Sequence, residues 1–431
     1  MEYFEIIVLV VSFIILLALG VPIAYSIGIS GSLTLLLSIM PLPAFTTFAQ
    51  RMATALDSFA LLAIPFFILA GQLMNQGGIA IRLIDFAKVL VGRLPGGLAF
   101  VNIIANMLFG AISGSAAASA SAIGSFMTPK MKEEGYDPAY SAAVNITSAT
   151  TGLVIPPSNI LIVYSLASGG VSIAALFLAG YIPGILTGFV LMTVAAAFAY
   201  RKNYPVGEVV SFKTGIFKFL DAIPSLLLLV IVIGGIIAGY FTATEASAIA
   251  VLYTLILSMI YRQVKFNDIP AILLRTVGIT SIVLLLVGTS MGLSWVMSYA
   301  NIPQSVSEGL LSLSANPFVI LLVINLILLF VGIFMDMTPA VLIFTPIFLP
   351  VVVDLGMDPI HFGIVMVMNL SVGLCTPPVG SVLFIGCSVA KIGIEKVIKP
   401  LIPLFIAMIV VLMLVTYLPQ ISLWLPGLFG F

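Results

Sequence analysis

Charged residues are scarce in this chain, and their scarcity excludes most classes of soluble protein. Only 7% of the 431 residues are Asp, Glu, Lys or Arg, whereas 61% are hydrophobic and the mean hydropathy is +1.28. About a quarter of an average globular chain is charged. Apolar runs of the roughly 20 residues needed to cross a bilayer occur along the whole length. The composition therefore indicates a polytopic integral membrane protein.

Residues that usually perform catalysis or bind transition metals are also few. The chain has one histidine and two cysteines. Cys375 and Cys387 lie inside apolar segments, where we interpret them as buried small hydrophobic residues rather than a disulfide or a metal pair. His361 opens a predicted helix at the external face, which favours a surface or capping role over a proton relay. The sequence does not predict an enzyme.

The positions of Lys and Arg predict the orientation of the chain in the membrane. Fifteen of the sixteen basic residues fall in connections that can share one side, which we take as the cytoplasm, and only Arg51 breaks the pattern. The connections 169–172, 240–244, 301–315 and 351–359 contain no Lys or Arg. Both termini are therefore predicted to be periplasmic.

The most informative feature is an internal duplication at a distance of 221 residues. Each copy contains Gly-x-Asp-Pro, then a glycine, then a Pro-Pro pair. In the first copy these are Gly135, Asp137, Pro138, Gly152 and Pro156–Pro157, and in the second Gly356, Asp358, Pro359, Gly373 and Pro377–Pro378. Glycine and paired prolines in the middle of apolar segments are typical of the broken helices of secondary transporters.

Two further blocks are predicted to be re-entrant hairpins. The block at about 97–131 lies between Arg93 and Lys130, both cytoplasmic, so it must enter the membrane and return. Its glycine- and serine-rich centre is typical of a hairpin tip. The block at about 316–350 has no basic residue at either end, so it is predicted to enter from outside. Because the hairpins occupy equivalent places and face opposite ways, the repeat is inverted.

The predicted fold is an all-α polytopic membrane protein with an inverted repeat, two re-entrant helical hairpins and two broken transmembrane helices. The first repeat is predicted at 1–215 and the second at 216–431. The broken helices are 138–168 and 360–390, and 78–93 and 262–275 are predicted to lie along the cytoplasmic interface. The other predicted helices are 3–20, 21–40, 53–77, 173–199, 219–239, 245–261, 276–300 and 400–425.

Breaks inside the apolar spans are the candidate functional positions. An unpaired peptide group in hydrocarbon costs several kcal/mol, so a break survives only where it lines a cavity or binds something. Proline removes an amide hydrogen and frees the carbonyl four residues earlier. Such carbonyls, together with Ser and Thr hydroxyls, suit a small hard cation such as sodium. We predict one sodium site at Ser113, Ser115, Gly152 and Ile155, and a second at Gly332, Asp336, Thr338, Gly373 and Thr376.

The substrate is predicted to lie between the two hairpin tips. Half-helix N-termini after the proline pairs present free amides and a positive dipole end, which suits a carboxylate. An ionisable residue at membrane depth, such as Asp336, is functional by default. The side chains predicted to reach the substrate are those of Ser113, Ser115, Ser158, Asn159 and Asp336.

Other polar residues have plainer explanations. Small residues in membrane helices most often serve close packing, which is the favoured interpretation of the serine-rich run from Ser119 to Ser125. Asp57 and Glu245 lie near the ends of their segments, and we interpret them as interfacial groups or contacts to a partner.

Several stretches resemble the large membrane subunit of tripartite ATP-independent periplasmic (TRAP) transporters, and the resemblance runs along nearly the whole chain. The stretches include FGAISGSAAASASAIG, GLVIPPSNILIVY, GIFMDMTPAVLIFTPIFLP and GMDPIHFGIVMVMNLSVGLCTPPVG. The resemblance implies sodium-coupled import of an organic acid anion across the bacterial inner membrane by an elevator motion. The hairpins and broken helices would form the transport domain, and the remaining helices the scaffold.

The resemblance also implies partners and a coupling ion. A separate small four-helix membrane subunit and a soluble periplasmic substrate-binding protein are expected, with Na+ as the coupling ion. Sialic acid (N-acetylneuraminate) is the favoured substrate by overall similarity, and a C4-dicarboxylate is next.

Two alternatives to a tripartite importer remain at this point. One is a self-sufficient sodium/dicarboxylate carrier of similar design, which neighbouring genes for a binding protein and a small membrane subunit would argue against. The other is an intramembrane serine protease, because Gly28-Ile29-Ser30-Gly31 matches Gly-x-Ser-Gly and His361 could be its base. That motif is short and frequent in glycine-rich membrane helices, so the protease is disfavoured.

Overall fold

A computed structural model describes residues 2–205, 212–314 and 316–431, and within these ranges the chain is helical without a β-strand. Eight helices among the described residues are long and apolar enough to cross a membrane. The first half contains α1 Glu2–Ala18, α2 Ile23–Leu35, α3 Pro41–Leu56, α4 Ala63–Gln76, α5 Ile79–Val91, α6 Gly97–Ser113, α7 Ala116–Glu133, α8 Pro138–Thr151, α9 Asn159–Ala167 and α10 Ile173–Lys202. The second half contains α11 Phe212–Ile237, α12 Ala243–Ile260, α13 Ile269–Tyr299, α14 Ile302–Leu313, α15 Pro317–Phe334, α16 Met337–Asp354, α17 Pro359–Gly373, α18 Ser381–Ala390, α19 Ile394–Tyr417 and α20 Gln420–Leu428. Two short 3-10 helices, Phe59–Leu62 and Phe266–Asp268, precede α4 and α13.

The duplication in the sequence is a duplication of helices. Helices α7 and α16 differ by 221 residues at both ends, and the same distance separates the starts of α8 and α17 and of α10 and α19. Helices α6 and α7 form the first hairpin, and α15 and α16 form the second. The predicted fold class, an inverted repeat with two hairpins and two broken helices, is confirmed.

Each broken helix stops at the predicted place. Helix α8 ends at Thr151 and α9 begins at Asn159, with Pro156–Pro157 between them. Helix α17 ends at Gly373 and α18 begins at Ser381, with Pro377–Pro378 between them. A proline ring clashes with the preceding helical turn and its nitrogen cannot donate. Two consecutive prolines therefore end the helix locally, whatever packs around it.

Paired glycines allow each hairpin to cross the broken helix of its own repeat at backbone contact. A Cβ atom on Gly152 would lie 2.4 Å from the Cα of Gly110 in α6. In the second repeat a Cβ atom on Gly373 would lie 2.6 Å from the Cα of Gly332 in α15. No side chain fits at these distances, so each crossing depends on a glycine on both segments that meet there.

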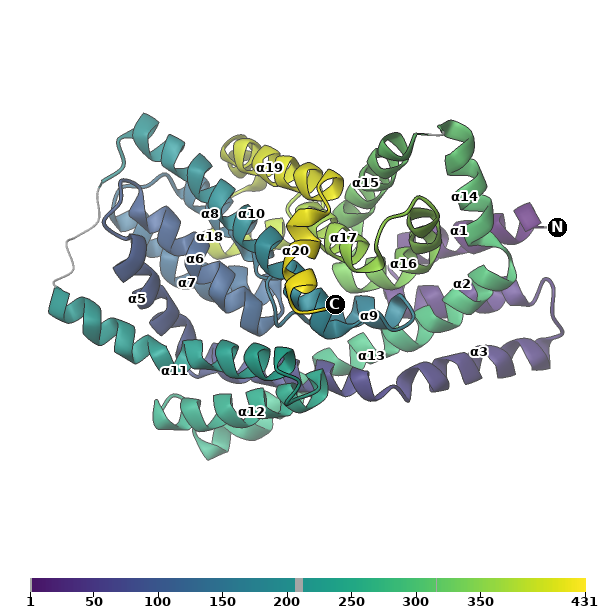
Figure 1. Ribbon diagram of the computed structural model, residues 1–431, viewed down its shortest axis with the longest axis horizontal. Helices are drawn as coiled ribbons and strands as arrows, with labels where there is room; N and C mark the ends of the chain where they lie inside the picture. The colour runs from purple at the N-terminus through teal and green to yellow at the C-terminus, as the bar shows by residue number, and fades with distance from the viewer. Residues whose placement is uncertain (1, 206–211, 315) are drawn as a thin grey trace.

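The two repeats interlock through the half-helices that follow the breaks. The returning helix of the first hairpin, α7, packs against α18 of the second repeat, and α16 packs against α9 of the first. Around this centre, α4 packs on α12, and α13 packs on α2 and α3. Figure 1 shows α3, α11 and α12 along the lower edge of the view, outside the hairpins. The hairpin tips are thus held at the centre of the molecule.

Several helix predictions were wrong where the fold changes a local pattern. Helix α3 begins at Pro41, whereas the predicted helix began at residue 53. The additional residues pack against α13 as part of α3. Residues 269–275, predicted to lie at the interface, belong to α13. The predicted external connection 301–315 contains α14. Helix α14 follows α5 by about the same 221 residues and is therefore its counterpart in the second repeat. The predicted helix 400–425 divides into α19 and α20 around Pro419.

The surface role predicted for His361 is also wrong. Its side chain is only 1% exposed, and Nδ1 lies 3.1 Å from Ser422 Oγ in α20 while Nε2 lies 3.4 Å from the carbonyl oxygen of Thr416. The physical reason is that α20 returns onto α17 and covers the residue. His361 therefore fastens the C-terminal helix to the broken helix of the second repeat.

The glycine crossings lead to a stability prediction. Replacing Gly152 with alanine should destabilise the protein by about 1–3 kcal/mol or more, because the new methyl group overlaps backbone atoms that cannot move independently. The unfolding temperature in detergent measures the effect. Gly278→Ala is the matched control, since nothing lies within 4 Å of its Cβ position. Equal unfolding temperatures for the two variants would contradict the tight crossing.

Candidate functional site

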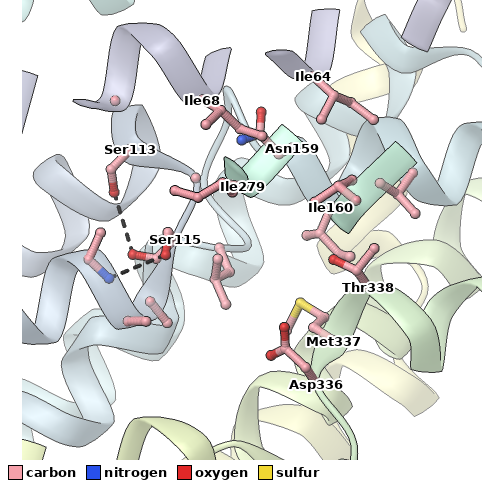
Figure 2. A pocket seen from close by; sticks show the side chains of 18 of the residues that line it. Ile64, Ile68, Ser113, Ser115, Asn159, Ile160, Ile279, Asp336, Met337 and Thr338 are labelled. Carbon is pink, nitrogen blue, oxygen red and sulfur yellow. Dashed lines mark hydrogen bonds between the residues drawn. The ribbon is translucent and has the colours of Figure 1, made fainter. Parts of the chain in front are cut away.

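A cavity of about 400 Å³ lies between the two hairpin tips. Figure 2 shows Ser113 and Ser115 facing Asp336, Met337 and Thr338 across this space, with Asn159 and Ile160 also on its wall. The lining comprises residues 113–118 and 336–338 of the tips, Leu153, Asn159, Ile160, Val163, Leu374, Ser381 and Val382 at the breaks, Ile64, Ile68, Gly71, Gln72 and Asn75 of α4, and Ile279 and Val283 of α13. The cavity therefore has one wall made of breaks and another made of intact helices.

The first hairpin tip is a tight turn closed by its own side chains. Gly114 adopts a left-handed conformation (φ +62°), and a Cβ atom there would lie 2.7 Å from Asn159 Nδ2. Glycine suits both constraints. Ser115 then caps α7, because its Oγ accepts a hydrogen bond from the Ala118 amide at 3.2 Å. The Ser113 hydroxyl points to the Ser115 carbonyl oxygen, 3.5 Å away. The tip thus gathers hydroxyl and carbonyl oxygens at the cavity wall.

The second tip differs from the first at one decisive position. Asp336 is the residue before α16, as Ser115 is the residue before α7, but its side chain makes no such capping bond. The side chain is exposed to the cavity, where it stands beside Thr338. Among the described residues that line the cavity, Asp336 is the single one with a formal charge. The two tips therefore present a neutral oxygen face and an acidic face.

The structure gathers five of the predicted site residues around the cavity: Ser113, Ser115, Asn159, Asp336 and Thr338. The others lie at the crossings and breaks. Gly152, Gly332 and Gly373 form the helix crossings, and Ile155 lines a separate apolar cavity of about 280 Å³. Ser158 Oγ donates to the Leu153 carbonyl oxygen, and Thr376 Oγ1 donates to the Val372 carbonyl oxygen at 2.9 Å. The ligand roles of all these residues stay predictions.

Buried asparagines that the sequence analysis missed fasten the first hairpin to its broken helix. Asn106 Nδ2 in α6 lies 2.6 Å from Asn102 Oδ1, 3.1 Å from Asn145 Oδ1 and 2.9 Å from Ser148 Oγ in α8. Ser119 of α7 donates to Asn106 Oδ1 at 2.7 Å, so this serine packs at a helix contact and is also hydrogen-bonded. The spacing of Asn102 and Asn106, one turn apart in an apolar helix, was the signal that could have revealed them.

A smaller network does the same in the second repeat. Asn369 Nδ2 in α17 lies 2.7 Å from Asn325 Oδ1 in α15, and Asn325 Nδ2 lies 3.3 Å from Thr416 Oγ1. All three residues are almost fully buried. Networks of this kind make each hairpin and its broken helix one rigid unit.

Three residues that the sequence left without a firm role have local structural ones. Glu245 accepts from the Thr242 backbone amide at 2.8 Å, which completes a capping box at the start of α12. Asp57 is the residue after α3, where the chain turns towards α4. Ser30 donates to the Ile27 carbonyl oxygen at 3.2 Å, while both ring nitrogens of His361 face other partners. Ser30 and His361 therefore do not form a catalytic pair.

A model of the family described as "Tripartite ATP-independent periplasmic transporter, DctM component" matches residues 10–421. The chain belongs to this family. DctM proteins are transporter permeases rather than enzymes, so this chain is a multi-pass inner-membrane subunit of a tripartite import system. The resemblance stated from the sequence is confirmed.

Relatives of this DctM chain cover it almost completely. It is 60% identical over 430 residues to "Uncharacterized protein YgiK" of Salmonella typhimurium, covering 100% of this chain and 99% of that protein. It is 39% identical over 406 residues to the C4-dicarboxylate TRAP transporter large permease protein DctM of Pseudomonas aeruginosa, covering 94% of each. It is 38% identical over 382 residues to the sialic acid TRAP transporter large permease protein SiaM of Vibrio cholerae, covering 88% of this chain and 89% of that one.

A solved structure shares the fold at low sequence identity. The crystal structure of the Alcanivorax borkumensis YdaH transporter superposes with a TM-score of 0.68 at 13% identity and covers 91% of both chains. At this identity the likeness shows the fold alone. It agrees with the all-helical architecture of the DctM chain.

The acidic tip generates a prediction for transport. Asp336→Asn should reduce transport to background, because the variant keeps the shape of the side chain but removes the one charge on the cavity wall. Uptake of the cognate substrate by the reconstituted tripartite system measures it. Asp354→Asn, at the exposed far end of the same helix, should transport like wild type. Normal transport by Asp336→Asn would remove this tip from the mechanism.

The asparagine network generates a prediction for stability. Asn106→Leu should destabilise the protein, because each buried polar group that loses its partner costs about 1–3 kcal/mol. The unfolding temperature in detergent should fall well below that of wild type. Ser125→Ala is a mild control, since Ser125 is exposed and its hydroxyl bonds only within its own helix. An unchanged temperature for Asn106→Leu would show that the network adds nothing to the fold.

Proposed function

We propose that this DctM chain imports an organic acid anion by sodium symport, after a periplasmic binding protein delivers the substrate. The observation that carries the proposal is the charge of the cavity. Asp336 lines it, and none of the described lining residues is Lys or Arg. An anion entering this space therefore meets a carboxylate and no fixed cation, so cations must enter with it.

The magnitude of the repulsion supports cotransport. Two like charges about 4 Å apart repel by roughly 4 kcal/mol at an effective dielectric constant of 20. Sodium ions bound at the two tips would turn the net electrostatic interaction of the site with a carboxylate from repulsion to attraction. A gradient of sodium would then be coupled to the movement of the anion, because the anion binds well only when the cations are present.

The proposed sodium sites combine each tip with the break of its own repeat. The first would use Ser113, Ser115, Gly152 and Ile155, and the second Gly332, Asp336, Thr338, Gly373 and Thr376. The hydroxyl and carbonyl oxygens of the first set are neutral, and hard cations prefer oxygen ligands. The glycine crossings support the pairing, since they bring each tip and break into direct contact.

We further propose that hairpins and broken helices move together as the transport domain. The asparagine networks and glycine crossings support this, because they join each hairpin to its broken helix. The interlocking of α7 with α18 and of α16 with α9 joins the two repeats. The remaining helices would form the scaffold, with both termini on the periplasmic side and a separate small four-helix membrane subunit beside them.

Sialic acid remains the first candidate substrate and a C4-dicarboxylate the next. Relatives named for these two substrates are 38% and 39% identical, and a relative from Escherichia coli named for 2,3-diketo-L-gulonate is 36% identical. All three are organic acids, which supports the chemical class. A binding screen of the partner binding protein against these acids decides among them.

Reconstitution tests the proposed coupling. Uptake into proteoliposomes should require both an inward sodium gradient and the cognate binding protein. The gradient drives transport in the proposal, and the binding protein delivers the substrate. Radiolabelled substrate measures it, and potassium in place of sodium is the control. Uptake that continues unchanged without sodium would refute the ion sites. Sodium-driven uptake without the binding protein would instead favour a self-sufficient carrier.

A further inference from the structure

Helix α4 presents two carboxamides to the cavity. Gln72 and Asn75 are three residues apart, so they share a face of the helix, and both line the cavity that Asp336 lines. The same face carries Ile68 one turn and Ile64 two turns before Gln72. Polar side chains in a membrane helix are expensive and mark functional positions more often than packing.

Neither carboxamide has a partner of its own. Asn75 is exposed and Gln72 is half-buried, and neither side chain makes a hydrogen bond with any residue in the described ranges. An amide group offers two donors and one acceptor oxygen. Both groups are therefore free to bind something that enters the cavity.

The first hairpin tip contacts α4 directly beside Gln72. A Cβ atom on Gly71 would lie 3.0 Å from the carbonyl oxygen of Ser113, so glycine lets the helix and the tip approach at backbone distance. Gln72 follows directly in the chain. Asn159 begins α9, which also packs on α4, and its Oδ1 is buried without a hydrogen-bond partner. The free amides of α4 thus stand next to the residues proposed to hold the substrate.

Helix α4 does not belong to the hairpin unit. Its main packing partners are α12 and α13, which lie outside the hairpins and broken helices. The cavity is therefore closed by two groups of helices, and a displacement of one group past the other would separate Asn159 and Ser113 from Gln72 and Asn75.

We infer that Gln72 and Asn75 form the second wall of the substrate site and donate hydrogen bonds to the oxygens of the organic anion. This inference rests on the proposed function and adds specificity residues to it. Amide donors bind carboxylate and hydroxyl oxygens alike, so they suit an acid that also carries hydroxyl groups. Because they sit on the other group of helices, they bind the substrate only in the arrangement seen here.

Leucine variants test the inference in the complete reconstituted system. Gln72→Leu and Asn75→Leu keep approximate size and remove the donors. Each should raise the KM for sodium-driven uptake about tenfold or more, since a hydrogen bond to a charged group is worth about 1.5–3 kcal/mol and 1.4 kcal/mol is a factor of ten. Gln76→Leu is the matched control, because Gln76 lies on the same helix but does not line the cavity. The control should keep the wild-type KM.

A second measurement tests the inference even if the leucine variants fold poorly. In an Asn75→Cys variant of the full system, a maleimide should label the new thiol, and saturating C4-dicarboxylate or sialic acid, whichever the wild type transports, should slow labelling at least severalfold. The two native cysteines are buried and serve as the unreactive background. Labelling at the same rate with and without substrate would overturn the inference.

The two proposals fail in different ways. If wild type shows no sodium-dependent uptake of any organic acid, the proposed function is wrong. If wild type transports but Gln72→Leu and Asn75→Leu share the KM of Gln76→Leu, the proposed function stands and the second wall is wrong.

Discussion

A peptide group that leaves a helix inside a membrane must find another partner, and this constraint organises the whole DctM chain. Two proline pairs and two hairpin turns break the helical hydrogen bonding at the centre of the molecule. The breaks are tolerated because they face one another around a cavity instead of facing lipid. The glycine crossings, the capping of α7 by Ser115 and the interlocking of the repeats all serve to hold these four breaks together.

The duplication supplies two similar halves, but the site depends on where they differ. Ser115 and Asp336 occupy the same place before the returning helix of their hairpins. Serine closes its own tip by accepting a backbone hydrogen bond, whereas aspartate keeps its carboxylate turned to the cavity. One tip is therefore neutral and the other acidic. The two tips differ in sequence, Ser113-Gly114-Ser115 against Phe334-Met335-Asp336, so a duplicated scaffold acquires an asymmetric binding site. The acidic tip is the reason that an anion would need accompanying cations in the proposed mechanism.

Rigidity and access come from separate groups of helices. Buried asparagines tie each hairpin to its broken helix, so the residues proposed to bind ions keep their relative positions. The opposite wall belongs to α4, which packs on α12 and α13 and brings Gln72 and Asn75 to the cavity. In the proposed transport movement, contacts within the first group would persist and contacts between the two groups would be exchanged. That division is the physical basis of the proposed elevator motion, in which the site would be reached from one side of the membrane and then from the other.

The sequence alone determined the features that depend on local chemistry. Composition indicated the membrane, the positions of Gly and Pro located the breaks at 152–157 and 373–378, and the distance of 221 residues revealed the repeat, because backbone limits act within a few residues of the break. Tertiary structure decided which faces meet. It buried His361 under α20, joined Asn106 to Asn145 and Ser148, and formed α14 in a connection without a strong apolar pattern. It also brought Gln72 and Asn75 to the cavity that Asp336 lines. These contacts join residues far apart in the chain, and helical periodicity shows that a helix has a polar position without showing which other helix will stand against it.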